Sequence, residues 1–376
     1  MRHSSVFCFL PPHILENIVE HGTDQQRQRA VQTVRQSDQF RMQRQAITRQ
    51  AVARAPAAAV ITKQRVVYTA NYLSNLPGTI VRQEGAPPTG DPAADEAYDG
   101  AGSTFDLYWE VYQRNSIDGN GKRLDSTVHY QVGYDNAFWN GQQMVYGDGD
   151  EDLPPAQRLF NRFTIAVDVI GHELTHGVTQ ATSNLAYVLQ PGALNESFSD
   201  VFGSLVKQRQ LGHTAATADW IIGQGLLTAN VNGVGIRSMK APGTAYDDPV
   251  LGKDPQPAHM SNYVQTADDN GGVHINSGIP NHAFYLAAVA LGGYAWEKAG
   301  NIWFVSLQRL GSNASFQDAA NLTFTVAGEL YGANSLEQQA IRTAWDGVGI
   351  SVADLPPATN PGCLPTLLKS IGIQTR

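Results

Sequence analysis

The sequence predicts an α+β fold with a β-rich N-terminal lobe, a helical C-terminal lobe and a small helical leader in front of them. Three observations support this prediction. The 376 residues exceed what one hydrophobic core usually serves, so more than one folded unit is expected. Strand and turn signals dominate residues 60–149, whereas helical periodicity dominates from about residue 159 to residue 350. Hydrophobic residues make up 42% of the chain, which is enough to fill sizeable cores.

The leader differs in charge from the rest of the chain. Residues 1–55 hold eight arginines and four acids, a net charge of +4, so the rest carries −12 to give the total of −8. Pro12 suits the first turn of a helix that Gly22 ends, with an apolar stripe formed by Ile14, Leu15, Ile18 and Val19. Thr23 can cap a second helix, whose main apolar positions are Ala30, Val31 and Val34. On charge alone, a nucleic-acid arm or a solvated helical hairpin is the alternative interpretation.

The β-rich half follows a stretch of small residues, 51–59, that is typical of a linker or a site of proteolysis. Strands are expected at 79–81 and 127–133, with a strong turn at 118–121. One amphipathic helix, at 105–112, is expected to interrupt them.

The helical half follows. Its expected helices lie at 163–182, 195–208, 280–291, 302–310, 316–331 and 336–345, and loops dominate 233–272. The long helix at 163–182 joins the two halves, which implies a cleft between them.

That joining helix contains an H-E-x-x-H motif, His172-Glu-Leu-Thr-His176. Histidines four residues apart lie on one helical face and can bind one ion, while Glu173 is placed to contact water at the metal. The alternative is an exposed helix with two unrelated histidines. A catalytic zinc site needs a third protein ligand and an open position.

Glu196 is the expected third ligand, 20 residues after His176. The spacing lets the chain turn at Pro191-Gly192 and return as a second helix beside the first. Asp200, one turn further on, can accept the outer N–H of a ligand histidine. Without the H-E-x-x-H motif, Glu196 and Asp200 would be assigned to a solvated helical face.

Two residues are candidate donors for the negative oxygen that forms during peptide hydrolysis. His274 can serve if Asp269 holds its far nitrogen, and Tyr187 lies between the two metal-ligand segments. On spacing alone, a hydrogen-bonded core histidine and a packed tyrosine are the simpler interpretations.

These motifs together resemble the thermolysin-like zinc metallopeptidases. The resemblance runs in order through about residues 65–350 and includes the segments 136–141, 172–176, 192–200, 236–239, 270–278 and 344–349. It implies a two-lobed thermolysin-like fold with one catalytic zinc ion in the cleft. The implied zinc ligands are His172, His176 and Glu196, with Glu173 as general base. Tyr187 and His274 are implied transition-state donors, and the implied supporting residues are Asp269, Asp200 and Asn195.

The resemblance also implies how substrate binds. Asn136 and Ala137 match the edge segment that holds the substrate backbone, and Arg237 matches a residue that contacts a substrate carbonyl. The first pocket on the leaving-group side would include Val169, Ile222 and Ile236. Endopeptidase cleavage before bulky apolar residues is therefore expected.

Calcium binding is where the sequence departs from the family. Asp168 and Asp219 match part of the acidic cluster of a double calcium site. Lys207, Ile221 and Gln224 stand where further acids are expected, and a lysine is incompatible with a hard-cation site. The sequence therefore predicts that the double calcium site is absent.

The leader resembles the short pro-region of the protealysin-type subgroup, which carries a Pro-Pro-Leu motif; here Pro11-Pro12 precede His13. We expect residues 1–50 to be an inhibitory propeptide whose Phe9, Leu10, Pro11 and Pro12 fill the cleft until a cut near Ala51. Cys8 is expected to be buried, with ligation of zinc as the alternative. The remaining expected units are residues 51–180 (N-terminal lobe with the zinc helix), 181–350 (helical lobe) and 351–376 (a C-terminal extension that contains Cys363).

Several classes of partner and place are not expected. The net charge of −8 argues against a nucleic-acid binder, and no apolar run reaches the ~20 residues of a membrane span. Residues 6–10 are too short for a secretory signal, so an intracellular protein or non-classical export is expected, although the family is mostly secreted. We therefore predict a monomeric enzyme that acts on peptides and proteins and is inhibited by its own propeptide. The alternative function is a catalytically silent module that binds peptides. An aminopeptidase is disfavoured, because the sequence shows no identifiable acidic residue to anchor a free amino terminus.

Overall fold

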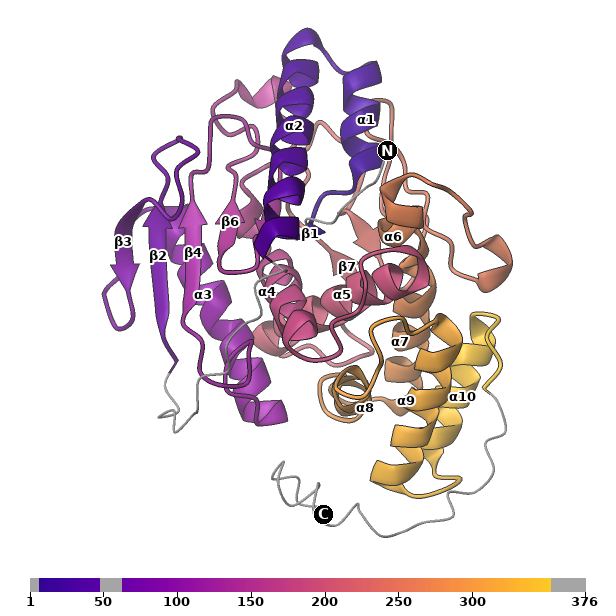
Figure 1. Ribbon diagram of the computed structural model, residues 1–376. Coiled ribbons are helices and arrows are strands. Elements are labelled where there is room, and N and C mark those ends of the chain that lie inside the picture. The colour runs from indigo at the N-terminus through magenta and orange to yellow at the C-terminus, as the bar shows by residue number, and fades with distance from the viewer. Residues whose placement is uncertain (1–6, 48–62, 353–376) are drawn as a thin grey trace.

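The computed structural model describes residues 7–47 and 63–352 of the chain. It has a β-rich lobe and a helical lobe, and the two helices of the leader lie across the junction between them (Figure 1). The predicted α+β architecture is therefore confirmed. Within these residues, no helix is both long and apolar enough to cross a membrane.

The β-rich lobe is built on one six-stranded sheet with the strand order β1-β5-β6-β4-β2-β3. Neighbouring strands pair in parallel at β2–β4 and β4–β6, and the other pairs are antiparallel. The strands are β1 (Phe7–Cys8), β2 (Arg65–Thr69), β3 (Thr79–Gln83), β4 (Leu124–Val128), β5 (Ala137–Trp139) and β6 (Met144–Tyr146). The leader thus supplies one edge strand of the catalytic sheet, antiparallel to β5.

Two predictions for this lobe need correction. The expected strand 127–133 ends at Val128, because His129 and Gln131 adopt positive φ angles of 53° and 55° that break the extended backbone. The expected helix at 105–112 is the end of a longer helix, α3 (Pro92–Asp106), which continues as a π-helical segment, Leu107–Val111. The alanine- and glycine-rich first part of α3 has too few large apolar residues for its periodicity to be visible.

The leader forms α1 (Pro12–His21) and α2 (Asp24–Ile47), as predicted. Thr23 caps the start of α2 as expected, because its hydroxyl accepts from the Gln26 amide. In return, the Gln26 side chain accepts from the Thr23 amide. The expected apolar positions of α2 differ in their burial. Ala30 is buried and Val34 packs partly buried against the core, and the other buried side chains among residues 24–37 are polar: Gln26, Thr33 and Ser37. On this side Thr33 accepts a hydrogen bond from the Asp135 amide, so α2 meets polar groups of the β-rich lobe.

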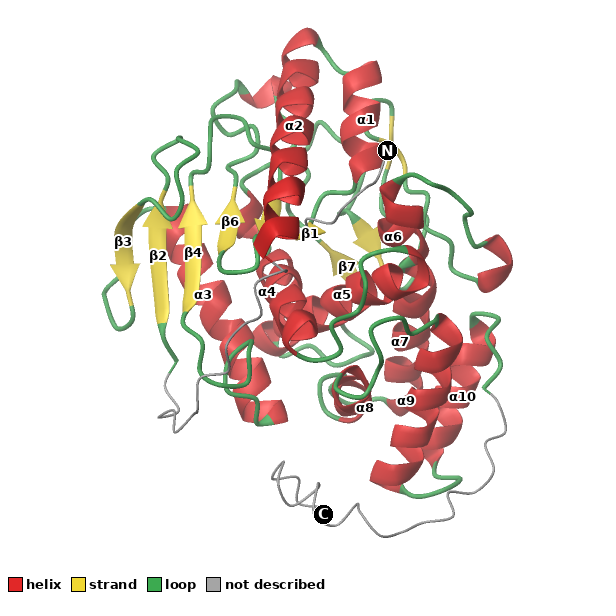
Figure 2. Cartoon of the chain, viewed as in Figure 1, coloured by secondary structure: helices red, strands yellow, loops and turns green. Residues whose placement is uncertain are grey.

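The centre of the molecule is a pair of packed helices, α4 (Val167–Ala181) and α5 (Leu189–Leu211) (Figure 2). They approach closely at Gly203, because glycine has no side chain there. A Cβ at this position would lie only 2.5 Å from the Asp168 carbonyl oxygen. The turn expected at Pro191-Gly192 is misplaced, since both residues lie inside α5. The chain reverses in the loop 182–188 instead.

The helical lobe continues with α6 (Asp269–Asn276), α7 (Gly278–Leu291), α8 (Lys298–Leu307), α9 (Phe316–Tyr331) and α10 (Leu336–Gly347). The connection between α5 and α6 contains two small strand pairs, β7 (Ile221–Ile222) with β8 (Arg237–Ser238) and β9 (Asp247–Asp248) with β10 (Gly252–Lys253). Single 3₁₀ turns occupy Pro155–Gln157, Phe163–Ile165 and Met260–Asn262. The expected helices after residue 280 are thus confirmed to within a few residues.

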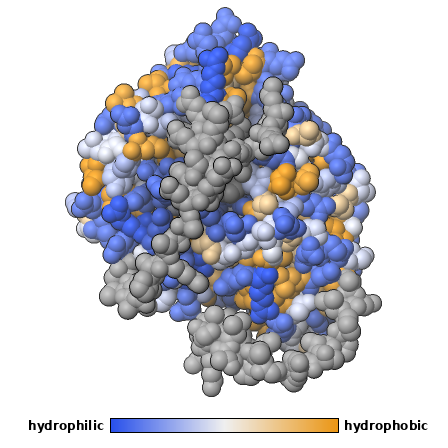
Figure 3. All heavy atoms as spheres, in the orientation of Figure 1, coloured by the Kyte–Doolittle hydropathy of each residue, from blue (hydrophilic) through white to orange (hydrophobic). Residues whose placement is uncertain are grey.

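One buried apolar cluster extends through both lobes and includes Phe9, Leu10 and Ile14 of the leader. The leader therefore shares the core of the catalytic lobes. On the face shown in Figure 3, by contrast, hydrophobic residues are scattered in separate groups among hydrophilic ones.

Candidate active site

Two histidines of α4 face each other at the bottom of the cleft. The Nε2 atoms of His172 and His176 are 3.1 Å apart, and both side chains are fully buried. Their outer nitrogens are held by acceptors on α5: His172 Nδ1 lies 2.8 Å from Asp200, and His176 Nδ1 lies 2.9 Å from the side-chain oxygen of Asn195. Donation from Nδ1 leaves the Nε2 lone pairs directed toward the same point, which is the arrangement that a metal ion requires.

Glu196 of α5 completes this group. Its carboxylate oxygens lie 3.4 Å from His172 Nε2 and 3.5 Å from His176 Nε2. Oε2 of Glu196 is buried and has no hydrogen-bond partner. Burial alone would raise the pKa of Glu196, but the charges of His274 and His176 hold it well below its usual value. Two imidazole nitrogens and a carboxylate around one point fit a tetrahedral zinc ion with a fourth position open.

Glu173 is adjacent to this group but has a different partner. Its ligand atom lies within 4.8 Å of those of His172 and His176. One carboxylate oxygen accepts the Trp139 amide N–H at 2.9 Å, and the other is buried without a hydrogen-bond partner. Burial raises the pKa of Glu173 to about 8, against the opposing charge of His172. The carboxylate is therefore held at the substrate edge of the cleft and suited to exchange a proton.

The two candidate donors come together from distant segments. Tyr187, in the loop before α5, donates to Glu196, and its hydroxyl oxygen lies 3.2 Å from His274 Nε2. Asp269 holds His274 twice, accepting from its Nδ1 at 2.6 Å and from its amide at 2.8 Å. The left-handed backbone of residues 270–272 folds this short segment back on itself. His274 Nε2 is thereby fixed beside Tyr187.

Arg237 contacts both the acceptor of His172 and the leader segment. Its guanidinium donates to both oxygens of Asp200 at 2.8 Å, and Asn281 donates to the same carboxylate at 2.8 Å. Burial would raise the pKa of Asp200, but the charge of Arg237 and the hydrogen bond from His172 lower it to about 2. Asn281 was not predicted from the sequence, because a lone asparagine in the apolar helix α7 gives no signal of this role.

The leader segment Cys8–Leu10 lies in the cleft. The Phe9 amide donates to the Ala137 carbonyl at 3.0 Å, and the Leu10 amide donates to the Asn136 side chain at 2.8 Å. Arg237 donates to the Phe9 carbonyl at 3.1 Å. Of the four residues expected to contact the cleft, Phe9 and Leu10 make these hydrogen bonds, and Pro11 and Pro12 follow them at the start of α1.

The Phe9 ring belongs to the same buried cluster as the residues predicted to form the first pocket. Its edge meets the His172 ring with centroids 5.4 Å apart, and the Arg237 guanidinium lies 4.7 Å from its centroid. The predicted pocket residues Val169, Ile222 and Ile236 are all buried. A further residue, Gly223, was missed: a Cβ there would lie 3.1 Å from Ile236 and 3.2 Å from the Phe9 ring. Its φ of +74° also favours glycine.

The Cys8 side chain is buried away from the histidines. Its sulfur lies 3.7 Å from the Ser37 hydroxyl of α2 and packs in a cluster with Tyr130, Tyr134, Phe138 and Val145. The structure therefore favours the buried cysteine over the alternative of a zinc ligand. The proposed cut near Ala51 and the C-terminal extension with Cys363 lie outside the described residues.

Lys207 of α5, on which the calcium prediction depends, lies between two carboxylates. Its ammonium lies 3.0 Å from Asp168 and 2.9 Å from Asp219 and donates to the Ile221 carbonyl. Burial would lower the pKa of Lys207, but the charges of Asp168 and Asp219 raise it above its ordinary value. The amine is therefore a fixed positive charge between two carboxylates.

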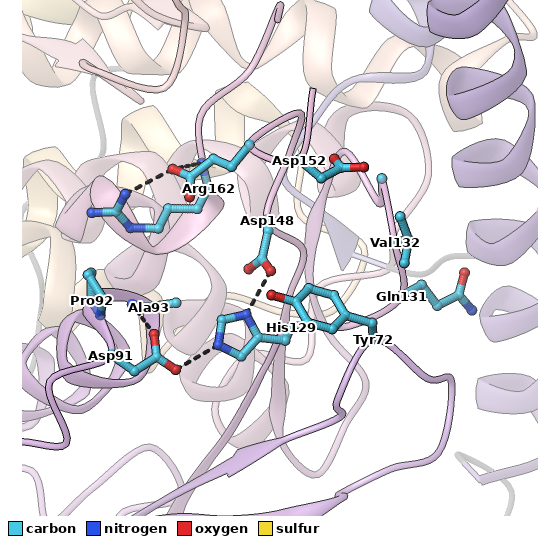
Figure 4. A pocket seen from close by; sticks show the side chains of 12 residues that line it. Tyr72, Asp91, Pro92, Ala93, His129, Gln131, Val132, Asp148, Asp152 and Arg162 are labelled. Carbon is cyan, nitrogen blue, oxygen red and sulfur yellow. Dashed lines mark hydrogen bonds and ion pairs between the residues drawn. The ribbon is translucent and has the colours of Figure 1, made fainter. Parts of the chain in front are cut away.

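A separate pocket of about 480 Å³ opens on the β-rich lobe beside α2. At its base, His129 lies between Asp91 and Asp148, with each ring nitrogen 2.7 Å from a carboxylate (Figure 4). The hydrogen bond to Asp148 raises the pKa of His129 to about 9, with burial opposing and Asp91 adding to the increase. On the rim, Arg29 of the leader forms two hydrogen bonds with Asp152.

Comparison with known proteins agrees with this geometry. A family model described as "Thermolysin metallopeptidase, catalytic domain" matches residues 20–180, and one described as "Thermolysin metallopeptidase, alpha-helical domain" matches residues 183–350. The chain is 49% identical to an "Extracellular metalloprotease" of Pectobacterium carotovorum subsp. carotovorum over 354 residues, 94% of this chain and 99% of the relative. It is 45% identical to "Protease PrtS" of Photorhabdus sp. (strain Az29), over 92% of each chain.

A solved structure is similar over nearly the same length. The precursor of protealysin, a metalloproteinase from Serratia proteamaculans, superposes with a TM-score of 0.81 at 50% sequence identity. The match covers 92% of this chain and all of that one. With family models that together cover most of its length and a zinc-binding geometry at their junction, the chain belongs to the thermolysin family of metallopeptidases.

Proposed function

We propose that the protein is the precursor of a zinc endopeptidase that cleaves peptide bonds on the N-terminal side of bulky hydrophobic residues. The observation that carries the proposal is the convergence of His172, His176 and Glu196 beside Glu173, with the donors His274 and Tyr187 facing the same space. His172, His176 and Glu196 would hold the ion. Zinc, when bound there, would polarise the substrate carbonyl and lower the pKa of the attacking water.

The chain's own residues supply the proton transfer. The Glu173 carboxylate would take a proton from the attacking water and deliver it to the nitrogen of the leaving amine. The Trp139 amide fixes one of its oxygens and leaves the other available for this exchange. Asp200 and Asn195 would hold the two histidines in the tautomer that directs Nε2 into the site.

His274 and Tyr187 would stabilise the negative charge that develops on the carbonyl oxygen. His274 is suited to donate from Nε2 because Asp269 holds its Nδ1. Asp269 therefore acts as a positioning residue. The Tyr187 hydroxyl lies close enough to His274 Nε2 for both donors to serve one oxygen.

The substrate backbone would lie along β5. Ala137, Arg237 and Asn136 present a carbonyl, a guanidinium and a side-chain acceptor in the order that an extended peptide can use. The apolar pocket of Val169, Ile222 and Ile236 supports a preference for a bulky hydrophobic residue after the cleaved bond, since Phe9 fills it here.

The leader would act as an inhibitory propeptide, residues 1–50, in front of lobes at 51–180 and 181–350 and an extension at 351–376. The support is occupancy of the cleft by Phe9 and Leu10, together with an ion pair from Arg29 to Asp152 that holds α2 on the β-rich lobe. A stiff, apolar segment fills the cleft at a small entropic cost. Peptides and proteins would be the partners of a monomeric enzyme that binds neither nucleic acid nor membrane, and the extracellular naming of the first relative favours action outside the cell.

The double calcium site of the family is proposed to be absent. Lys207 already neutralises Asp168 and Asp219, and its ammonium stands between the oxygens that a calcium ion would need.

Casein hydrolysis by the intact chain and by the chain after removal of the leader tests the proposal. We expect a low rate before removal, a rise of at least tenfold afterwards, and loss of activity with a strong zinc chelator that added zinc restores. Lack of hydrolysis by the zinc-loaded, leader-free protein would favour the silent peptide-binding module instead.

A further inference from the structure

The leader places one of its own peptide bonds where the proposed chemistry would occur. The Cys8 carbonyl oxygen lies 3.0 Å from His274 Nε2, the nitrogen that is also 3.2 Å from the Tyr187 hydroxyl. His274, one proposed oxyanion donor, therefore contacts this carbonyl, and Tyr187, the other, contacts His274. A segment that merely blocked the cleft would have no need to present a peptide carbonyl to these donors.

The next two residues lie in the direction and register of a bound substrate. After the Cys8 carbonyl, the Phe9 amide donates to Ala137, the Phe9 carbonyl accepts from Arg237, and the Leu10 amide donates to Asn136. The Phe9 side chain meanwhile fills the apolar pocket that opens beside His172. These contacts place the bond between Cys8 and Phe9 across the catalytic residues.

We propose that the enzyme hydrolyses its own Cys8–Phe9 bond within the folded precursor, a step separate from removal of the leader. The inference rests on the proposed function and names one bond as its substrate. The oxygen of a water molecule bonds to the Cys8 carbonyl carbon and the C–N bond to Phe9 breaks. Glu173 passes a water proton to the Phe9 nitrogen, so that the products are a Cys8 carboxylate and a Phe9 amine.

The remaining leader would stay docked after this cleavage. Asn17 of α1 donates to the Leu251 carbonyl at 2.9 Å, and His13 lies 2.8 Å from the Tyr246 hydroxyl. Arg29 of α2 is paired with Asp152. All three contacts lie on the Phe9 side of the bond, so cleavage separates residues 1–8 without disturbing them. The clipped chain therefore keeps the cleft occupied by Phe9 and remains inhibited.

The test follows the amino terminus of the purified, zinc-loaded full-length chain by intact-mass measurement and terminal sequencing. We expect a product that has lost residues 1–8 and begins at Phe9, formed at a rate that is independent of protein concentration. Glu173→Ala should abolish its formation. Phe9→Asp should slow it at least tenfold, whereas the matched apolar variant Phe9→Leu should retain it.

A second readout does not depend on turnover. In the full-length Glu173→Ala chain, hydrogen exchange at the Phe9 and Leu10 amides should be slow, and Asn136→Ala should release Leu10 more than Phe9. Fast exchange at both amides would overturn the substrate register.

Other outcomes are equally decisive. If the preparation cleaves casein once its leader is removed but never yields a Phe9 terminus, the inference fails and the proposed function stands. A Phe9 terminus in Glu173→Ala, or a rate that rises with concentration, would show that another molecule cuts the bond. Full activity of the clipped chain would contradict continued docking, and failure to cleave either casein or the leader would count against both proposals.

Discussion

Arg237 and Asp200 form a fully buried ion pair in which two guanidinium nitrogens each lie 2.8 Å from a carboxylate oxygen. The same carboxylate accepts from His172, and the same guanidinium donates to the backbone of the segment in the cleft. One pair of side chains therefore connects the geometry of the metal site to the binding of a peptide.

Removing one partner of this pair should reduce both the stability of the protein and the binding of the leader. In Arg237→Met the buried Asp200 charge loses its partner, so we expect a loss of about 3–5 kcal/mol in the free energy of unfolding. Binding of the leader should weaken as well, because the Phe9 carbonyl loses its donor. Denaturant unfolding measures the loss of stability. Arg309→Met is the control, because it disrupts a partly exposed pair with Glu329. We expect this control to change stability by less than about 1 kcal/mol. Equal losses in the two variants would contradict this account.

Lys207, which lies between Asp168 and Asp219, gives a prediction about calcium. Addition of calcium should change the melting temperature little, because Lys207 supplies the positive charge between Asp168 and Asp219. Lys207→Ala should lower the free energy of unfolding by about 3 kcal/mol, since the buried Asp168 is left uncompensated.

Lys298→Ala is the matched control, because its pair with Glu337 is exposed and should be worth less than about 1 kcal/mol. A large stabilisation of the natural protein by calcium, beyond that of an equal ionic strength of sodium chloride, would refute the assignment.

His13 makes docking of the leader sensitive to pH. Burial lowers the pKa of His13 to about 4 from 6.5, with Asp269 opposing the change and His274 and Arg237 adding to it. Because the docked pKa is depressed, docking has its full strength above about pH 6.5 and weakens as the pH falls from there toward 4. Hydrogen exchange of α1 in the full-length Glu173→Ala chain, corrected for intrinsic rates, should reveal this loss of protection.

His13→Leu removes the titrating group and should flatten that pH dependence while protection at pH 7 stays high. An unchanged slope between pH 7 and 5 in the variant would assign the effect to other groups.

His129 should make the stability of the protein depend on pH in the opposite direction. Its pKa is raised to about 9 by Asp148 and Asp91, so its contribution to stability is complete below its unfolded pKa near 6.5 and is lost as the pH rises through 9. We expect the free energy of unfolding to fall by about 1–2 kcal/mol between pH 7 and 10 through this residue, with allowance for partial solvent access. Urea unfolding of the natural chain and of His129→Gln measures it, and parallel pH curves for the two would contradict it.

The sequence was most informative where one residue type determines the local outcome. Pro12, Gly22 and Thr23 predicted the ends of the leader helices, and the spacing of His172 and His176 predicted two imidazoles on one face. Such signals depend on neighbours within a few residues, which a single sequence displays.

Features that depend on distant contacts could not be predicted in the same way. The polar residues that α2 buries meet partners such as Asp135, about a hundred residues away, so helical periodicity alone did not identify them. Gly223 is required by the closeness of Ile236 and the Phe9 ring, which come from two other parts of the chain. The register of Cys8–Phe9 against the catalytic residues likewise arises only when β1 pairs with β5.

The role of Glu173 is the central claim, and one variant tests it most directly. Glu173→Gln keeps the size of the side chain and its acceptor for the Trp139 amide but removes the proton-accepting carboxylate. With the leader removed, we expect the rate of casein hydrolysis to fall by at least about 10²-fold while the protein retains one zinc ion per chain, because Glu173 acts on water. Near-native turnover, or loss of zinc in parallel with activity, would contradict the account.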